Sequence, residues 1–242
     1  MKAQIIKTLD AAVKKNLSLR NATFFKKVDN SVFDNEGSYT EGVFIALDTV
    51  KYDWMQTHYV GKPGYFSQIV VLDGRLYTYL STGLEEQNEW EKAEAETYKL
   101  VDMIGPLLEN SFKEEYIETI QAEKNQNSKY FIDLSEDYLK EFKEEAIEDI
   151  KDAILQMDEK EFDFIQAARD QIMSIQEREY LHAKITITIN EDGYLVGFKE
   201  TSTYKEPDSE YEEITIYQDY RLVELNLDNP RELFPEVDGD CY

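Results

Sequence analysis

Residues 184–189 read KITITI, and this alternation of isoleucine with lysine or threonine decides how the chain folds. Successive side chains of a β-strand point to opposite faces, so the isoleucines share one face and the polar side chains share the other. Such a strand belongs to an antiparallel sheet with one buried face and one face in water. The NEDG that follows, at 190–193, is typical of a turn and leads into a second strand over 194–204.

Short runs of the same kind lie in two blocks, one towards each end of the chain. Turn residues separate neighbouring runs, such as DNEG at 34–37 and DG at 73–74, and turns this tight join antiparallel strands. The connections are too short for parallel crossovers. We predict strands over 23–28, 42–53, 57–60, 65–72, 75–80, 130–134, 212–217 and 220–227.

Apolar residues three and four apart predict helices at the start and in the middle of the chain. The pattern indicates one helix over 3–15 and another over 98–122, which Gly105 and Pro106 break or kink. Ser135 is a good N-cap for a further helix, and the helical pattern continues to 179.

Strands followed by helices and then by strands again predict an α+β protein. We expect one domain over 1–242, in which the helical segments 98–122 and 136–179 are inserted between the strand blocks 23–82 and 184–227. The later strands would complete the sheet that the earlier strands begin, with the helices gathered on one face.

The composition favours a packed and strongly acidic protein. Hydrophobic residues make up 42% of the 242, and 51 acidic against 26 basic residues give a net charge of −25. No basic stripe is present to neutralise phosphates, so nucleic acid is not an expected partner, and an anionic membrane surface is disfavoured. No stretch reaches the ~18 apolar residues that span a bilayer. The charge is compatible with a basic protein partner or with loosely held divalent cations.

Side chains that commonly carry catalysis are isolated in this sequence. His58 and His182 each lack a companion His or Cys at ligand spacing, which favours ordinary strand histidines. Cys241 is the one cysteine, so an intramolecular disulfide and a thiolate metal site are excluded. No nucleophile elbow, phosphate-binding loop or calcium-hand motif occurs. We therefore expect a protein that is not an enzyme, with no metal and no cofactor.

Several short motifs follow one another in a characteristic order. An N-terminal helix runs into LSLRNAT at 17–23, VVLDGRLY occupies 70–77 and NEWEK occupies 88–92. YFIDLS at 130–135 precedes a helix, and DGYL at 192–195 lies in a hairpin. In this order the motifs resemble the LolA/LppX superfamily of bacterial lipoprotein carriers and lipid-binding lipoproteins, including uncharacterised lipoproteins of Gram-positive bacteria. The acidic helical stretch 136–179 is longer than the helical element usual in that superfamily.

The resemblance implies a curved antiparallel sheet, an incomplete β-barrel, whose concave face is covered by helices. Such a hollow holds an acyl chain at ~0.8 kcal/mol per buried methylene. The resemblance also implies an extracytoplasmic, membrane-anchored lipoprotein if a leader was trimmed from this chain, and a cytoplasmic protein otherwise. The residues expected to line the hollow are Phe44, Trp54, Ile69, Val71, Tyr77, Ile185, Ile187 and Phe198, although core packing is the favoured role of each.

Three functions compete at this point. The first is a cell-envelope module that binds or carries a hydrophobic small molecule, a lipid or a lipoprotein acyl chain. The second is an acidic interaction module in which 136–179 docks a basic protein, with a mimic of DNA as its extreme form. The third is an enzyme with an unfamiliar site, which requires carboxylates in a cleft with strongly raised pKa values.

Overall fold

A computed structural model of the 242-residue chain describes most of the sequence. The described residues are 2–30, 37–45, 52–59, 65–72, 75–82, 90–93, 101–108, 112–124, 128–156, 162–207, 211 and 213–235.

The strands of the described chain are long and the helices few. The strands are β1 (Asn21–Asn30), β2 (Gly37–Ile45), β3 (Tyr52–Tyr59), β4 (Tyr65–Leu72), β5 (Arg75–Thr82), β6 (Glu91–Ala93), β7 (Ile117–Lys124), β8 (Ser128–Leu134), β9 (Glu179–Ile189), β10 (Leu195–Lys205) and β11 (Ile214–Leu225). The helices are α1 (Lys2–Asn16), α2 (Val101–Leu108), α3 (Glu136–Gln156) and α4 (Phe162–Glu177), with 3-10 turns η2 (Glu114–Tyr116) and η3 (Pro230–Leu233).

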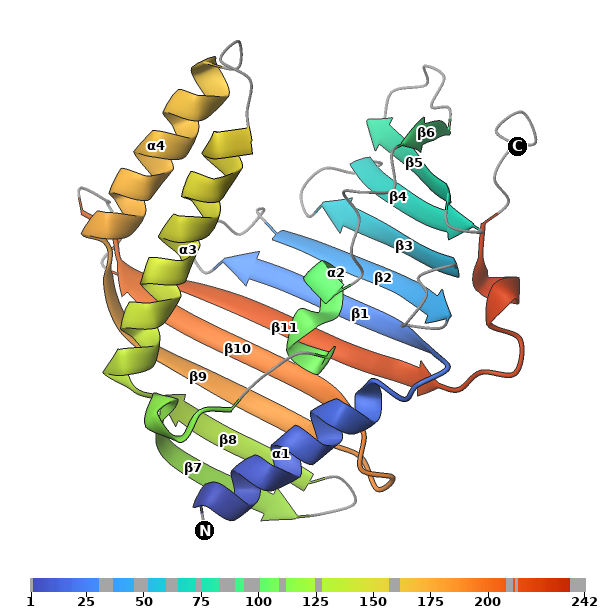
Figure 1. The fold of residues 1–242 in the computed structure, drawn as a ribbon, viewed down its shortest axis with the longest axis horizontal. Helices are drawn as coiled ribbons and strands as arrows, with labels where there is room; N and C mark the ends of the chain where they lie inside the picture. Colours follow the sequence, from blue (N-terminus) through green and yellow to red (C-terminus); the bar gives the residue numbers. More distant parts are fainter. Residues whose placement is uncertain are drawn as a thin grey trace.

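All eleven strands form one open antiparallel sheet. Its order is β6-β5-β4-β3-β2-β1-β11-β10-β9-β8-β7, so the two strand blocks of the sequence meet where β1 pairs with β11. Figure 1 shows the sheet running from β6 at one edge to β7 at the other without closing. The predicted α+β class, with a curved antiparallel sheet and helices over it, is confirmed.

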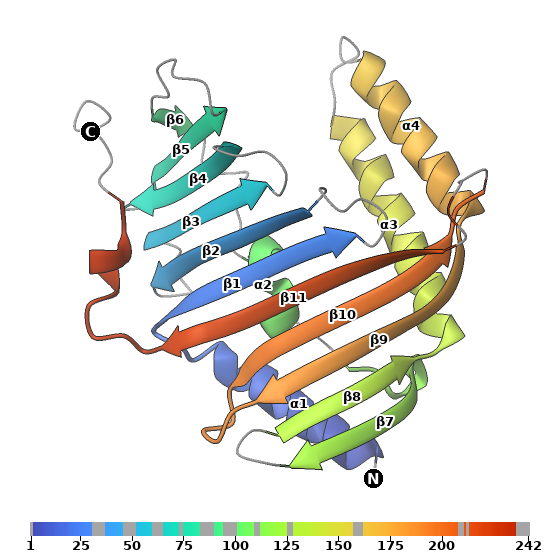
Figure 2. The ribbon, with the colours of Figure 1, turned by 180° about the vertical axis from the view of Figure 1, so that it is seen from behind.

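The two faces of the sheet differ in what covers them. We call the side that carries α1 and α2 the helix face, and the other side the open face; Figure 1 looks onto the helix face, and Figure 2 looks onto the open face. The main core lies between the helices α1 and α2 and the part of the sheet that runs, in sheet order, from β1 through β11, β10 and β9 to β8. Leu9 of α1, Ile104 and Leu107 of α2, and Ile187 of β9 are completely buried in it.

Asn16 joins three elements at the centre of this core. Its amide nitrogen donates to the Leu107 carbonyl at 2.8 Å and to the Leu195 carbonyl at 2.7 Å, and its side-chain oxygen accepts from the Leu195 N–H at 3.1 Å. The side chain is fully buried, so these bonds satisfy polar groups that water does not reach. The last residue of α1 is thereby fixed to both α2 and β10.

The helices α3 and α4 form an antiparallel pair that projects past the sheet beside β9 and β10 (Figure 1). Ser135 caps α3 as predicted, because its hydroxyl accepts from the Tyr138 N–H at 3.4 Å and its carbonyl accepts from the Leu139 N–H at 3.2 Å. At the same end of the pair, directly after the last residue of α4, Arg178 donates to Glu206 through Nε at 3.1 Å and through Nη2 at 2.9 Å.

The helix predicted over 98–122 is confirmed for Val101–Leu108 and is wrong for Ile117–Lys124, which is strand β7. Residues 98–100 and 109–111 of that prediction lie outside the described residues. A bulge between Ile117 and Thr119 shifts the alternation, so that Ile117 faces Leu134 while Ile120 faces Ile132. The two isoleucines therefore share one face of a strand although they stand three residues apart, a spacing that imitates a helix. Pairing with β8 decides the structure of this segment.

Two strand boundaries also differ from prediction. The single strand predicted over 42–53 is divided between β2, which ends at Ile45, and β3, which begins at Tyr52 and pairs with it. Conversely, the runs predicted at 212–217 and 220–227 form one strand, β11, which continues through the polar Gln218 and Asp219. Polar residues interrupt the apolar pattern there without interrupting the backbone ladder.

Candidate ligand-binding site

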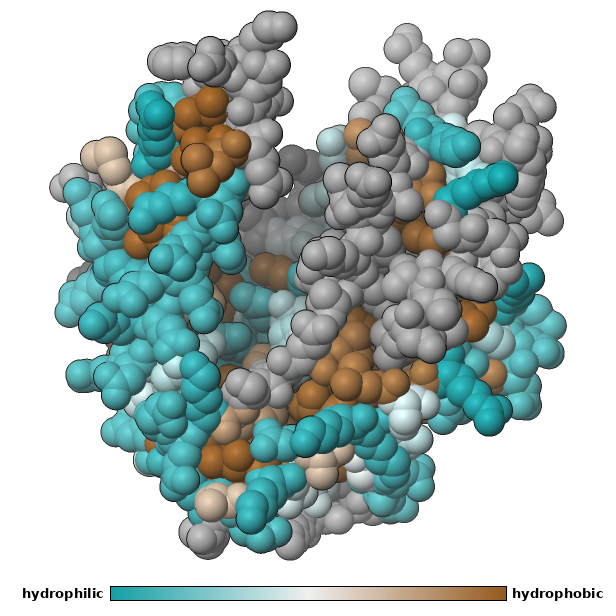
Figure 3. Space-filling model, viewed as in Figure 1, coloured by the Kyte–Doolittle hydropathy of each residue, from teal (hydrophilic) through white to brown (hydrophobic). Residues whose placement is uncertain are grey.

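The helix face is hollowed between the α3–α4 pair and the part of the molecule that contains α2. Figure 3 shows this hollow, and both hydrophobic and hydrophilic side chains are visible in it. The packing of the elements agrees, because α2 lies on β1, β10 and β11 whereas α3 lies on β9. The helix-face residues of β1, β10 and β11 beyond α2 therefore form the floor between the two helices.

That floor contains polar side chains within an apolar sheet face. Lys26 of β1 lies beside Tyr220 of β11, and in the next row Gln218 of β11 lies beside Glu200 of β10. The Tyr220 hydroxyl donates to the Gln218 side-chain oxygen. We call Lys26, Gln218, Tyr220 and Glu200 the floor cluster; on the β9 side it borders the buried Ile185 and Ile187.

The floor cluster reaches α3 through one hydrogen bond. The Tyr138 hydroxyl donates to Glu200 Oε1 at 3.2 Å. Burial raises the pKa of the Glu200 carboxyl, and the hydrogen bond from Tyr138 opposes that rise in part. Burial also raises the pKa of Tyr138, as does the neighbouring Glu200 charge, and the same two causes raise the pKa of Tyr220 to about 12. Both tyrosines are therefore neutral hydrogen-bond donors at ordinary pH.

Six of the eight residues predicted to line the hollow lie on the helix face. Five of them are almost completely buried, and Ile69 is partly buried at the edge of the main core. Ile185, Ile187, Phe198 and Phe44 belong to that core, while Val71 shares the face of Ile69 by strand alternation. Four of the six are therefore packed together in the main core, and Ile69 is the one of the six that is not almost completely buried.

Trp54 and Tyr77 lie on the open face instead. Met55, the residue after Trp54, belongs to the main core on the helix face. Because adjacent side chains of a strand point to opposite faces, Trp54 points to the open face. Trp54 pairs with Val70, which pairs with Tyr77, and the three pack with Trp90 and Phe234 in a second, smaller cluster. The structure therefore does not bring these two aromatic residues to the hollow with the other six.

The sequence reasoning missed the floor cluster, although a signal was present. In β1 the side chains of Phe24 and Val28 point to the same face of the sheet, and alternation places Lys26, midway between them, on that face too. Glu200 likewise stands between Phe198 and Ser202 on β10. A charged residue in the apolar phase of a strand marks a place where the buried face opens to water or to a ligand.

The open face has a groove of its own. It has a volume of about 560 Å³ and crosses β11, β1, β2 and β3 beside η3, with Phe25, Val43, Trp54, Val223 and Leu233 as apolar walls. The indole Nε1 of Trp54 is buried and has no hydrogen-bond partner in the described chain. The charged residues that line this groove are Glu41, Glu224 and Arg221.

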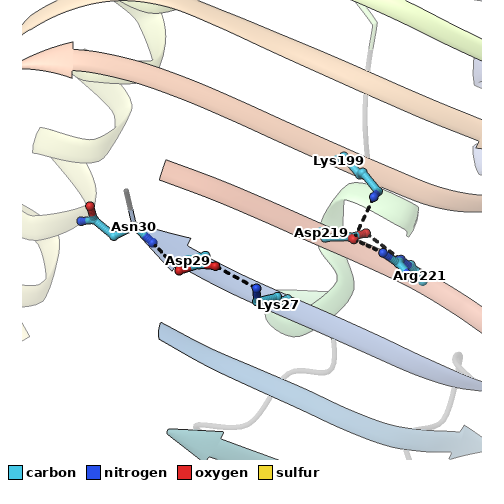
Figure 4. Close-up of polar contacts among 6 residues, drawn as sticks. All are labelled: Lys27, Asp29, Asn30, Lys199, Asp219 and Arg221. Carbon is cyan, nitrogen blue, oxygen red and sulfur yellow. Dashed lines mark hydrogen bonds and ion pairs between the residues drawn. The ribbon is translucent and has the colours of Figure 1, made fainter. Parts of the chain in front are cut away.

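Next to this groove the open face carries a compact set of ion pairs, shown in Figure 4. Asp219 accepts from Arg221 and lies 3.2 Å from Lys199 Nζ, while Lys27 pairs with Asp29 at 2.8 Å. Hydrogen bonds from Arg221 and Lys199 lower the pKa of Asp219 in spite of its burial. Each of the three basic side chains of this area is thus paired, and Lys199 and Arg221 share the single carboxylate of Asp219.

Within the described part of the chain, no group of three or more His, Cys, Asp or Glu side chains is placed to hold a metal ion. The same residues include no helix that is long and apolar enough to cross a membrane.

No protein-family model matches the sequence, and no curated protein matches it. Among solved structures, a crystal structure of a LolA superfamily protein from Nitrosomonas europaea is similar with a TM-score of 0.30 and 7% sequence identity, covering 94% of this chain and 97% of that chain. At this TM-score and identity the similarity establishes neither a family nor a function for this chain.

Proposed function

We propose that this protein is a non-enzymatic binding or carrier module that shelters a hydrophobic ligand, such as a lipid or an acyl chain, in the hollow of the helix face. The observation that carries the proposal is the gap between α2 and α3 over β1, β10 and β11 (Figure 3). The antiparallel sheet provides a floor and the helices at either side provide walls, and this concave shape is a general property of small-molecule sites.

The hollow has apolar side chains within reach of a bound chain. Val28 and Ile216 are half-buried on its floor, and Ile69 is half-buried on the β4 side of the same face. Each methylene that such surfaces remove from water stabilises a complex by ~0.8 kcal/mol. A cell-envelope location belongs to this proposal and rests on the motif resemblance alone.

The raised pKa of Glu200 is also a property of catalytic carboxyls. Acid–base catalysis by paired carboxylates requires a second carboxyl group at a set distance. Among the described residues, Glu200 is hydrogen-bonded by Tyr138, a neutral hydroxyl, and its pKa is explained by burial and by that bond. We therefore retain a binding function rather than an enzymatic one in the proposal.

The test is native mass spectrometry of gently purified protein, followed by titration with a fluorescent fatty acid. We expect a retained lipid or saturable binding, and we expect Val28→Trp to abolish it because the indole fills the hollow. Lys27→Trp is the matched control, since the neighbouring side chain points to the open face. An absence of both retained lipid and dye binding in the wild-type protein contradicts the proposal.

A second function is favoured by the charge of the α3–α4 pair. The α3 sequence contains eight acidic and three basic side chains, and Glu144, Glu145, Glu148 and Asp149 are exposed. Such a surface fits a basic protein partner. Binding of a polylysine probe is expected to weaken steeply with salt and to be lost in Glu144→Lys/Glu148→Lys. Salt-independent binding contradicts this alternative.

A further inference from the structure

Lys26 is a charged side chain in an apolar position. It points to the helix face of β1, and the residues two positions away on the same face are the buried Phe24 and the half-buried Val28. Across the sheet it pairs with Thr40 of β2 on one side and with Tyr220 of β11 on the other. Its ammonium group lies 5.4 Å from the centre of the Tyr220 ring.

The positive charge of Lys26 has no carboxylate partner among the described residues. Burial lowers the pKa of Lys26, so removal from water already works against its charged form. The chain has 51 acidic and 26 basic residues, so an acidic partner would be easy to provide. Lys27, the next residue, has such a partner in Asp29 at 2.8 Å on the open face.

The other members of the floor cluster suit an anion beside Lys26. The side-chain oxygen of Gln218 accepts a hydrogen bond from the Tyr220 hydroxyl. The amide N–H groups of the same side chain are the donors that Gln218 can offer to an anion. Glu200, the acidic group of the cluster, stands on β10 with β11 between it and β1.

We propose that Lys26 anchors the anionic head group of an amphiphilic ligand, a carboxylate or a phosphate attached to an alkyl chain, in the hollow of the helix face. This inference rests on the proposed function and specifies its ligand class. The head group pairs with a cation that is partly shielded from water, where the attraction is stronger than at an exposed site. The alkyl chain lies along the apolar surface of the sheet.

The experiment compares dodecanoate, dodecyl phosphate and dodecanol as competitors of a bound fluorescent fatty acid in four proteins. The four are the wild type, Lys26→Met, Lys26→Arg and Lys27→Met. Methionine keeps the length and apolar surface of the lysine stem and removes the charge. The wild type is expected to bind at least one of the two anions about tenfold more tightly than dodecanol, which corresponds to about 1.4 kcal/mol.

Lys26→Met is expected to abolish this preference while it binds dodecanol as well as the wild type does, and Lys26→Arg and Lys27→Met are expected to keep it. Whichever of dodecanoate and dodecyl phosphate is preferred identifies the head group as a carboxylate or a phosphate. If all three compounds bind equally, or if Lys26→Met keeps the preference, the anchor is refuted and the proposed function stands. If the wild type binds none of them, both ideas are refuted together.

A stability measurement guards against misfolding of the variant. Removing a partly buried charge that has no carboxylate partner in the described part of the chain is expected to leave the melting temperature of Lys26→Met equal to or above that of the wild type. A marked fall in melting temperature in the absence of ligand would mean that Lys26 has a structural role, and this result also overturns the anchor.

Discussion

The Tyr138 hydroxyl lies 3.2 Å from Glu200 Oε1, and this bond ties the first turn of α3 to the floor of the hollow. The position of α3 on the sheet therefore depends in part on the protonation state of the Glu200 carboxyl group. Because burial raises the Glu200 pKa above the ordinary glutamate value of 4.5, the folded state holds this proton more tightly than the unfolded state does.

The sign of the resulting pH dependence follows from proton binding. The unfolded chain releases the Glu200 proton first, so the free energy of unfolding falls as pH rises from 4.5 through the raised pKa and is level above it. Glu200→Gln is expected to be more stable than the wild type at pH 7 and to lose that advantage below 4.5. Thermal melts of both proteins across this range measure the difference.

Tyr138→Phe is the companion variant to Glu200→Gln. It removes the hydrogen bond that opposes the rise of the Glu200 pKa, so the fall in stability with pH is expected to become larger in total and to extend to higher pH. The variant is also expected to lose about 1–2 kcal/mol of unfolding free energy at pH 7, because a buried carboxylate is left without its donor. An unchanged pH profile in Tyr138→Phe would show that the bond is not formed in solution.

Asn16→Ala is expected to lower the free energy of unfolding by about 3 kcal/mol. The substitution leaves the Leu107 carbonyl and the Leu195 N–H and carbonyl without the partners that they have in the core. Chemical denaturation measures the effect, and Leu17→Ala is the control because the neighbouring side chain is 55% exposed. Equal losses in the two variants would contradict the role assigned to Asn16.

Gly42→Ala is expected to destabilise the fold by about 2 kcal/mol or more. A methyl group at Gly42 would lie 2.3 Å from the Trp54 carbonyl oxygen and 2.6 Å from the Phe24 ring. Gly105→Ala is the matched control, since a methyl group there meets no atom within 4 Å. We expect that control to be neutral or slightly more stable. Melting temperatures that fall by the same amount in both would argue against the close approach of β2 and β3 at Gly42.

The Arg178–Glu206 pair is expected to hold the end of α4 to the end of β10. Arg178 donates twice to Glu206 Oε1, and the Ser174 hydroxyl donates to the same atom at 2.6 Å. Both charged side chains are partly exposed, so a double-mutant cycle with Arg178→Met and Glu206→Gln is expected to give a coupling of about 1 kcal/mol at low salt. The coupling should shrink at high salt. Faster amide exchange in α4 of either variant would locate the effect, and a coupling indistinguishable from zero would refute it.

The sequence predicts the fold well wherever apolar alternation and turn chemistry agree. The alternation at 184–189 places Ile185 and Ile187 on one face of β9, and the turn signal at 73–74 separates strands in which Leu72 pairs with Arg75. Pairing between distant segments is less visible. The spacing of Ile117 and Ile120 is that of a helix turn, and only the bulge opposite β8 turns it into a strand pattern.

The candidate site is harder to predict than the fold because a strand pattern does not say which face becomes the hollow. Trp54 and Met55 are adjacent and both apolar, yet Met55 enters the main core and Trp54 faces the open groove. The aromatic character of Trp54 suggested a ligand and gave no information about direction. Conversely, Lys26 and Glu200 read as ordinary solvated charges until the register places both on the helix face.

The pairing of Ala22 with Leu225 has a consequence for biosynthesis. The central seam of the sheet joins β1 to β11, which follows all the other described strands in the chain, so an emerging chain leaves this edge of β1 unmatched until β11 has been translated. Forming contacts between such distant segments is slow, because a long loop must close before the contacts reward it. During that interval the exposed edge of β1 can pair with other chains. We therefore expect the protein to refold slowly and to depend on chaperones while β1 is unpaired.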